Sequence, residues 1–265
     1  MLRIYRWFSW LLLAVSLHVS GVAAEVVKLT LGYENRTVYP YMTGAGPDVP
    51  PENPGASVEL MQILDESIDE IEIEFVRYTW KACLAEMRRG KLDGIFNASY
   101  KPERRDYGRY PWAAGDVDSS RRLTTRTYRF YSPEDKPLDW DGSKINAPDY
   151  TVIAPKGYSV VNDLKLIGIE AREVETTTTA LRLLIEGRAD AAALLEESAE
   201  YLIDADPRFR SIEAHALPIK TKPYYLMLSH QFVDMHPDLA LKIWARLAEL
   251  RVTSLPALIS KYQGE

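Results

Sequence analysis

Two stretches of this sequence are built on the same plan, and this repeat constrains the fold most. Residues 79–99 (TWKACLAEMRRGKLDGIFNAS) and 176–196 (TTTTALRLLIEGRADAAALLE) each run from threonine through a helical pattern to glycine, aspartate and an apolar run. Threonine caps helix N-termini, so the predicted caps are Thr79 and either Thr176 or Thr177, and glycine ends helices because it adopts a left-handed conformation without strain. The repeat predicts two similar lobes with a cleft between them, although a single α/β domain also contains such units in series.

The apolar residues of both stretches recur with helical spacing. They are Trp80, Cys83, Leu84 and Met87 in the first stretch, and Leu181, Leu184 and Ile185 in the second. Strand-like runs at 71–76 and 172–175 precede the helices, and buried-looking runs at 94–98 and 191–195 follow them. A helix between two such strands is a βαβ unit, so each lobe is predicted to contain a mostly parallel sheet flanked by helices.

Polar residues gather where these strands are predicted to end. They are Glu34, Asn97, Ser99, Gly157, Tyr158, Ser159 and Glu196. Open parallel sheets bind ligands beyond the carboxyl ends of their strands, so these residues are candidate ligand contacts. Arg104 follows the lobe-one edge and could pair with a carboxylate, while a helix beginning near Ser159 would add amide donors from lobe two. Tyr39 and Tyr41 could supply rigid apolar walls.

Extended segments divide the rest of the chain. A first strand is predicted at 26–33, ending at Gly32, and a Pro- and Gly-rich loop follows from Thr43 to Gly55. Residues 119–132 and 215–228 are predicted to cross between the lobes and to allow hinge closure. The predicted organisation is a leader at 1–24, lobe one at 25–125, lobe two at 126–220, and a return to lobe one at 221–265.

The first residues resemble a secretory signal peptide. Arg3 and Arg6 precede an apolar run from Trp7 to Val19, and small residues precede a predicted cleavage site after Ala24. An uncleaved anchor is the alternative, but the run is shorter than the roughly 20 residues that span a bilayer. Loss of the two leader arginines takes the formal charge from −6 to −8. This charge disfavours nucleic acid and anionic membranes as partners and fits a soluble periplasmic protein.

Patterns of catalytic and metal sites are not found. Cys83 is the single cysteine and lies on the apolar helix face, so it is interpreted as a buried core thiol. The four histidines lack metal-site spacing, and GxSxG, HExxH, P-loop and GxGxxG motifs are absent from the sequence. No cofactor, metal or catalytic residue is therefore predicted.

Over nearly its whole mature length, the chain resembles the family 3 extracellular solute-binding proteins, the periplasmic amino-acid-binding components of ABC importers. The resemblance lies in the order of short motifs: Gly32-Tyr33-Glu34, Tyr39-Pro40-Tyr41, the helix entry at 55–60, Gly90-Lys91-Leu92-Asp93, Lys101-Pro102-Glu103-Arg104, Tyr110-Pro111, Gly187-Arg188-Ala189-Asp190 and the closing LISKY. It implies the type II two-lobe periplasmic binding protein fold, two hinge strands and delivery of a solute to an ABC permease.

The resemblance also implies roles for single residues. Arg104 matches the family's carboxylate-binding arginine and Ser99 its hydroxyl five residues earlier, but Lys101 replaces the usual threonine. This second cation indicates either a more acidic ligand or a shift of the motif by one residue, which would make Arg105 the partner. Glu34 matches an acidic residue at the ligand's polar end. The lobe-two aspartate that holds an α-ammonium falls on Leu195, so this anchor is missing unless Glu196 replaces it.

The sequence thus predicts an exported, monomeric protein that captures a small polar solute, anionic or zwitterionic, and the resemblance implies that it does so for an ABC importer. Arg104 would hold the anionic group, and Glu34 or Glu196 a cationic one. A sensor or partner-binding protein with a degenerate pocket is one alternative. A dehydratase-like enzyme on the same scaffold, with Glu196 or Glu34 as general acid, is another.

Overall fold

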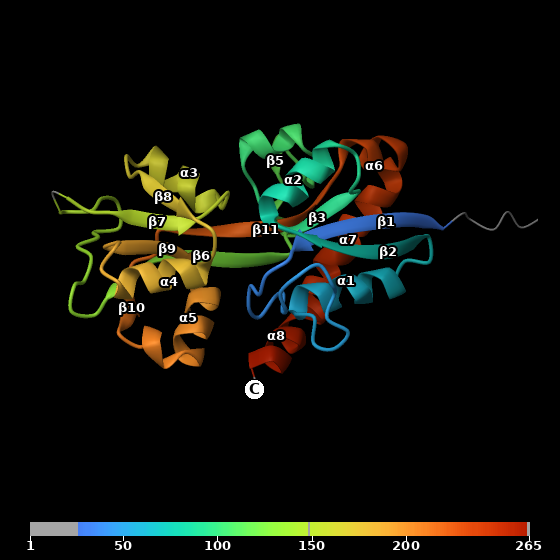
Figure 1. Ribbon diagram of the computed structural model, residues 1–265. Helices are drawn as coiled ribbons and strands as arrows, with labels where there is room; N and C mark the ends of the chain where they lie inside the picture. Colours follow the sequence, from blue (N-terminus) through green and yellow to red (C-terminus); the bar gives the residue numbers. More distant parts are fainter. Residues whose placement is uncertain (1–25, 148, 264–265) are drawn as a thin grey trace, which may run out of the picture.

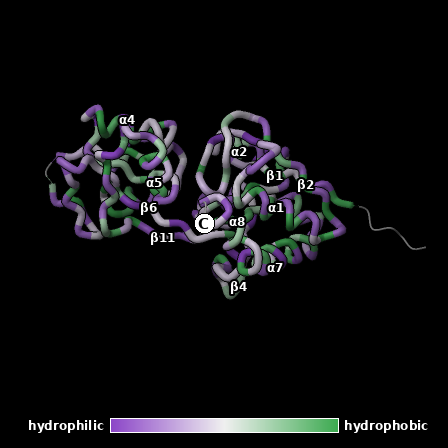
Figure 2. The backbone as a smooth tube through the Cα atoms, turned by 90° about the horizontal axis from the view of Figure 1, so that it is seen from below, coloured by the Kyte–Doolittle hydropathy of each residue, from purple (hydrophilic) through white to green (hydrophobic). Residues whose placement is uncertain are grey.

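The computed structural model describes residues 26–147 and 149–263. The predicted signal peptide and its cleavage site lie outside these residues. Figures 1 and 2 show two lobes with two long strands running between them, β6 (Thr124–Pro133) and β11 (Lys220–Leu228). The predicted lobe boundaries, after residues 125 and 220, fall within these two crossing strands.

Lobe one carries both ends of the described chain. Its strands are β1 (Val27–Glu34), β2 (Ile71–Tyr78), β3 (Gly94–Ser99) and a small hairpin of β4 (Trp112–Ala113) and β5 (Asp116–Val117). Its helices are α1 (Ala56–Glu66), α2 (Trp80–Arg88), α6 (His230–Met235), α7 (Pro237–Thr253) and α8 (Leu255–Gln263), with short 3-10 turns η1 (Pro102–Asp106) and η2 (Ser119–Arg121).

Lobe two is formed by the middle of the chain. Its strands are β7 (Val152–Pro155), β8 (Ala171–Val174), β9 (Ala191–Leu195) and β10 (Ile212–Ala214). Its helices are α3 (Ser159–Leu166), α4 (Thr177–Ile185) and α5 (Glu196–Ala205), with the 3-10 turn η3 (Pro207–Phe209). Among the described residues, no helix combines the length and apolar character needed to cross a membrane.

Apart from the β4–β5 hairpin, the described strands form one continuous sheet in the order β2-β1-β3-β11-β6-β9-β7-β8, with β10 beside β6. The pairs β1–β2, β1–β3, β7–β8 and β7–β9 are parallel, whereas β6 and β11 run antiparallel to their neighbours. Each lobe therefore has the predicted parallel core, and the crossing strands join the two halves into the predicted two-lobe fold (Figure 1).

Helices cover both faces of the sheet in each lobe. In lobe one, α1, α7 and α8 pack on one face, around residues such as Leu60 and Leu247, and α2 packs on the other through Trp80, Cys83 and Met87. Alternate residues of β9 likewise face opposite helix layers in lobe two. Strands buried on both faces must be apolar throughout, which explains the unbroken AAALL run of β9.

The two repeats use the same local contacts. Thr79 Oγ1 accepts a hydrogen bond from the Ala82 amide, and Thr176 Oγ1 accepts one from the Thr179 amide. Gly90 and Gly187 end the helices with φ of 70° and 65°. The aspartate of each repeat then ties its strand to the neighbouring one, because Asp93 accepts from the Thr30 amide at 2.9 Å and Asp190 from the Thr151 amide at 2.8 Å.

One prediction about an element limit was wrong. The first strand continues past Gly32 to Glu34, because β1 pairs with β2 in register as far as Glu34 and Tyr78. The strand of the second repeat ends at Leu195 as predicted, and Glu196 begins the helix α5.

The long loop at 43–55 folds against lobe one. The buried Arg77 guanidinium holds it by donating to the carbonyls of Thr43, Gly44 and Asp48 at 3.0, 2.9 and 2.8 Å. The Gly55 amide donates to the Tyr262 hydroxyl of α8 at 2.7 Å. These contacts fix both ends of the loop on lobe one.

Candidate functional site

A cavity lies between the lobes, at the carboxyl ends of the parallel strands. The room inside it is about 30 Å³ in this closed state, enough for about one or two water molecules, so it admits an organic solute only after the lobes move apart. It is lined by Glu34, Val38, Met42, Trp80, Phe96, Asn97, Ser99, Arg104, Arg126, Tyr128, Tyr158, Ser159, Leu195 and Tyr224. Residues from both lobes and both crossing strands therefore contribute to one wall.

Arg104 is held in the cavity by its own lobe and contacts the other. The side chain is 4% exposed, and its Nη1 donates to the Ser99 carbonyl at 2.7 Å and to Ser99 Oγ at 3.0 Å. Its Nη2 donates to the Gly157 carbonyl of lobe two at 3.3 Å, and the guanidinium lies 5.0 Å from the Trp80 ring centroid. The neighbouring Arg105 is exposed and stacks on Trp112, so Arg104 is the arginine that faces the cavity.

A second guanidinium, that of Arg126, enters the cavity from the crossing strand β6. It is 2% exposed and lies between the rings of Tyr41 and Tyr224, at 3.9 and 4.9 Å from their centroids. Its Nη2 donates to Asn97 Oδ1 at 2.8 Å. Two aromatic faces and an amide oxygen therefore fix this cation without a carboxylate hydrogen-bond partner among the described residues.

Asn97 is aimed into the cavity by an irregularity in β3. The pairing of β3 with β11 shifts between Tyr225 and Met227, so that Phe96 and Asn97 together oppose one residue of β11. Asn97 takes a φ of 58°, a left-handed conformation that asparagine tolerates better than most residues. A bulge of this kind redirects side chains, and here it lets both Phe96 and Asn97 reach the cavity wall.

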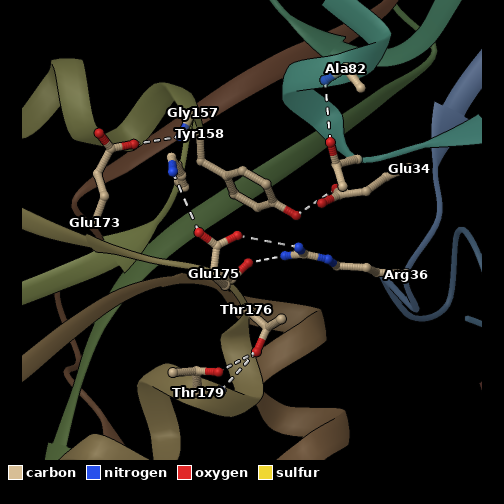
Figure 3. Close-up of polar contacts among 11 residues, drawn as sticks. Glu34, Arg36, Ala82, Gly157, Tyr158, Glu173, Glu175, Thr176 and Thr179 are labelled. Atoms are coloured by element: carbon tan, nitrogen blue, oxygen red, sulfur yellow. Dashed lines mark hydrogen bonds and ion pairs between the residues drawn. The ribbon is translucent and has the colours of Figure 1, made fainter.

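Glu34 connects the lobes across the cavity. Its Oε2 accepts a hydrogen bond from the Tyr158 hydroxyl of lobe two at 2.8 Å (Figure 3). Burial raises the pKa of the Glu34 carboxyl, because removal from water disfavours its charged form, although the Tyr158 hydrogen bond opposes the shift. Figure 3 also shows Arg36 of lobe one beside Glu175 of lobe two, at 3.6 Å between charged atoms. The cleft is thus closed in this structure.

Several polar atoms of the cavity wall have no hydrogen-bond partner within the described chain. They are Trp80 Nε1, Asn97 Nδ2, Arg126 Nε and Ser159 Oγ, in side chains that are at most 7% exposed. Three of these atoms are obligatory donors and the fourth is a hydroxyl that donates readily. A buried donor without a partner is costly, so this wall is suited to a ligand rich in acceptor oxygens.

The structure brings six of the sequence-predicted candidates to the cavity: Glu34, Asn97, Ser99, Arg104, Tyr158 and Ser159. Gly157 lies just behind the wall, where its carbonyl accepts from Arg104. Its amide donates to Glu173 at 2.6 Å, away from the cavity.

Tyr39, Tyr41 and Glu196 do not line the cavity. Tyr39 stacks on Tyr201 of lobe two with ring centroids 3.9 Å apart, and Tyr41 lies behind Arg126. Glu196 is the first residue of α5, and its carboxylate pairs with Arg129 of the neighbouring strand β6. Leu195, not Glu196, is the lobe-two residue that reaches the wall from β9.

The sequence interpretation missed Arg126, Tyr128 and Tyr224, which come from the crossing strands. A signal for Arg126 was present, because Thr124, Arg126, Tyr128 and Phe130 alternate along β6 and all four are buried. An arginine on the buried face of a strand needs a polar environment there. Trp80, Phe96, Val38 and Met42 were missed because apolar wall residues look like ordinary core residues in a sequence.

No family model and no curated protein matches the chain in sequence. Its fold is similar to that of a histidine kinase sensor domain with similarity to periplasmic binding proteins, with a TM-score of 0.69, 19% identity and coverage of 91% of this chain and 97% of the other. A Streptococcus pneumoniae ABC uptake transporter substrate-binding protein with bound histidine gives a TM-score of 0.68 at 18% identity, covering 90% and 93%.

The ligand-binding core of GluR0 in complex with L-glutamate is similar to the same degree. Its TM-score is 0.68 at 17% identity, over 91% of this chain and 99% of the other. These TM-scores establish a shared fold. Because the sequence identities are low, the ligand has to be argued from this cavity. The prediction of a periplasmic binding protein fold is confirmed.

Proposed function

We propose that this protein binds a small, carboxylate-bearing solute in the cavity between its lobes. The observation that carries the proposal is the buried Arg104 guanidinium beside four partly or wholly unpartnered polar side chains. A carboxylate can accept two parallel hydrogen bonds from a guanidinium and further ones from neighbouring donors. Groups from both lobes would then hold a single ligand.

The ligand would act on the lobe angle. Tyr158, Ser159 and Leu195 meet the cavity only when lobe two lies against lobe one, so a ligand that contacts all of them favours the closed state. Small-angle scattering of the chain from Glu25 onward, with and without the ligand, should show a more compact bound form. Superimposable profiles at saturation would contradict closure on the ligand.

The first test of binding is a thermal-shift screen against amino acids, polyamines, dicarboxylates and cyclic acids. A ligand at 100 times its dissociation constant stabilises the folded state by about 2.7 kcal/mol, which is readily visible. A shift with one class of acid would support the proposal. Stabilisation by polyamines alone would contradict it, because the cavity would then prefer cations.

We place this binding activity outside the cytoplasm, in a monomer that delivers its solute to an ABC permease. The leader-like sequence before Glu25 and the fold shared with an uptake-transporter protein support this role. The test is uptake of the solute by cells that lack the protein. Uptake should fall strongly and recover with the native gene, but not with a variant that cannot bind.

A sensory role is the second candidate, because a histidine kinase sensor domain has the same fold over almost its full length. In that case ligand uptake would not change on deletion. The closed protein would instead be captured by a membrane receptor in cross-linking experiments performed with and without the ligand.

A further inference from the structure

Positively charged side chains outnumber carboxyl groups around the cavity, and the carboxyl group already has a hydrogen-bond partner. Among the described residues that line it, the cations are Arg104 and Arg126, and the single carboxyl group is that of Glu34. Arg126 has no ion pair in this part of the chain, and its Nε has no hydrogen-bond partner. A ligand entering this wall therefore meets two guanidinium groups and one acid.

The Glu34 carboxyl already has a partner when the cleft is closed. The Tyr158 hydroxyl from lobe two donates to Oε2 at 2.8 Å, and Glu34 is 6% exposed. Burial also raises its pKa, which favours the neutral acid over the carboxylate. In the closed state this group is thus engaged by the protein itself.

Among its described residues, lobe two adds no carboxylate to the wall. The residue that β9 directs into the cavity is Leu195. The next residue, Glu196, is paired with Arg129, and Glu197 lies outside the wall, where its Oε1 is 3.5 Å from the Tyr41 hydroxyl. The lobe-two side of the cavity therefore offers hydroxyl and apolar groups: Tyr158, Ser159 and Leu195.

An ammonium group in this cavity would face two fixed cations, and Glu34, the single carboxyl among the described lining residues, already accepts from Tyr158 through Oε2. Ammonium donates three hydrogen bonds and accepts none, whereas the unpartnered atoms at Trp80, Asn97 and Arg126 are donors as well. Like charges brought together in a site of low dielectric repel strongly. A hydroxyl, oxo or second carboxylate oxygen in the same position would satisfy those donors.

We infer that the solute is an organic acid without an amino group, whose carboxylate lies at Arg104 and whose second polar group accepts hydrogen bonds from Asn97 and Arg126. This inference rests on the proposed function and narrows it. The cavity distinguishes hydroxy, oxo and dicarboxylic acids from the corresponding amino acids by its surplus of donors and by Leu195.

The test is isothermal titration with matched pairs that differ at one substituent: L-malate and L-aspartate, 2-oxoglutarate and L-glutamate, and L-lactate and L-alanine. We expect at least one acid to bind ten times more tightly than its amino partner. Leu195→Asp places an acceptor for ammonium in the wall and should reduce or reverse that ratio. Leu195→Asn, of nearly equal volume and without charge, is the matched control and should change the ratio less.

Failure of the inference is distinct from failure of the function. If an amino acid binds more tightly than its partner acid, and Glu34→Gln removes that preference, then Glu34 holds an ammonium and the inference is overturned, while solute binding stands. If none of the six compounds binds while circular dichroism shows a folded protein, binding of small carboxylates is overturned together with the inference. Equal affinities within every pair overturn the inference alone.

Discussion

The unit β2–α2–β3 of lobe one and the unit β8–α4–β9 of lobe two share a backbone plan and differ where they end. In both units the helix begins at a threonine cap and ends at glycine, and an aspartate then ties the following strand to its neighbour. The first then presents Asn97 and Ser99 to the cavity and leads to Arg104, whereas the second presents Leu195.

Because of this difference, lobe one supplies most of the groups that recognise a solute, and lobe two supplies contacts that close the cleft. Lobe one contains the cation at Arg104, the bulge at Asn97 and the acid at Glu34, so it holds most of the groups that can recognise a solute. Lobe two contributes Tyr158, Ser159 and Leu195, and its contacts with lobe one close the cleft. We expect loss of lobe-one groups to abolish recognition, and loss of lobe-two contacts to weaken closure.

The largest effect should come from Arg104→Ala. Removing one partner of a buried charge pair costs about 2–5 kcal/mol, so affinity for the acid should fall by about 30-fold or more. Arg105→Ala is the matched control, because Arg105 is exposed and lies over Trp112, and it should leave the affinity unchanged. Isothermal titration measures both. Equal losses in the two variants would refute the assignment of recognition to Arg104.

The shared aspartates should matter for stability in both lobes, though unequally. Asp93→Ala leaves the partly buried Thr30 amide without its charged acceptor, and we expect a loss of about 1.5–3 kcal/mol in the free energy of unfolding. Asp190→Ala should cost less, because that side chain is 40% exposed and water can replace it at the Thr151 amide. Urea unfolding of both variants gives the comparison. A larger loss for Asp190→Ala would mean that burial does not set the order.

The Glu34 carboxyl should make stability depend on pH. Burial raises its pKa above the ordinary 4.5, so the folded protein retains a proton that the unfolded chain has released. This contribution is fully present below about pH 4.5 and is lost as the pH rises through the folded-state pKa. Unfolding free energies from about pH 4 to pH 8 should therefore fall more steeply in the native protein than in Glu34→Gln.

The carboxyls of Glu197 and Glu200 have pKa values raised in the same direction, again mainly by burial. Both carboxyls are present in the native protein and in Glu34→Gln, so they give the two proteins the same dependence of unfolding free energy on pH. The difference between the two pH profiles therefore reports Glu34 alone. Parallel profiles would show that the Glu34 pKa is not raised in solution.

The smallest effect should follow from Tyr158→Phe, which removes the interlobe hydrogen bond and keeps the ring. The net contribution of one hydrogen bond is about 0.5–1.5 kcal/mol, so the affinity should fall by roughly two- to tenfold, with a more open ligand-free form in scattering. Tyr201→Phe retains the ring that stacks on Tyr39 and serves as the control. A hundredfold loss would place recognition in lobe two as well.

Local pattern was enough to predict the architecture, because the repeated features act within a few residues of the chain. The cap at Thr79 and the helix ends at Gly90 and Gly187 stand where the sequence placed them, and of the two threonines predicted for the second cap the structure uses Thr176. Arg104 could be identified because it follows a strand end closely. Glu196 was expected among the ligand contacts, but a helix begins there and its carboxylate pairs with Arg129 on β6.

By itself, the sequence determined the two βαβ units, their parallel strands and the edge where a ligand would lie, since helical spacing, caps and apolar runs are local properties. Only the tertiary structure decided which side chains meet at that edge. Arg126 arrives from a crossing strand, Asn97 is turned inward by a bulge whose partner is β11, and Tyr158 reaches Glu34 across the cleft. These contacts join residues far apart in the chain, and their geometry depends on how strands and lobes pack, which no short stretch of sequence contains.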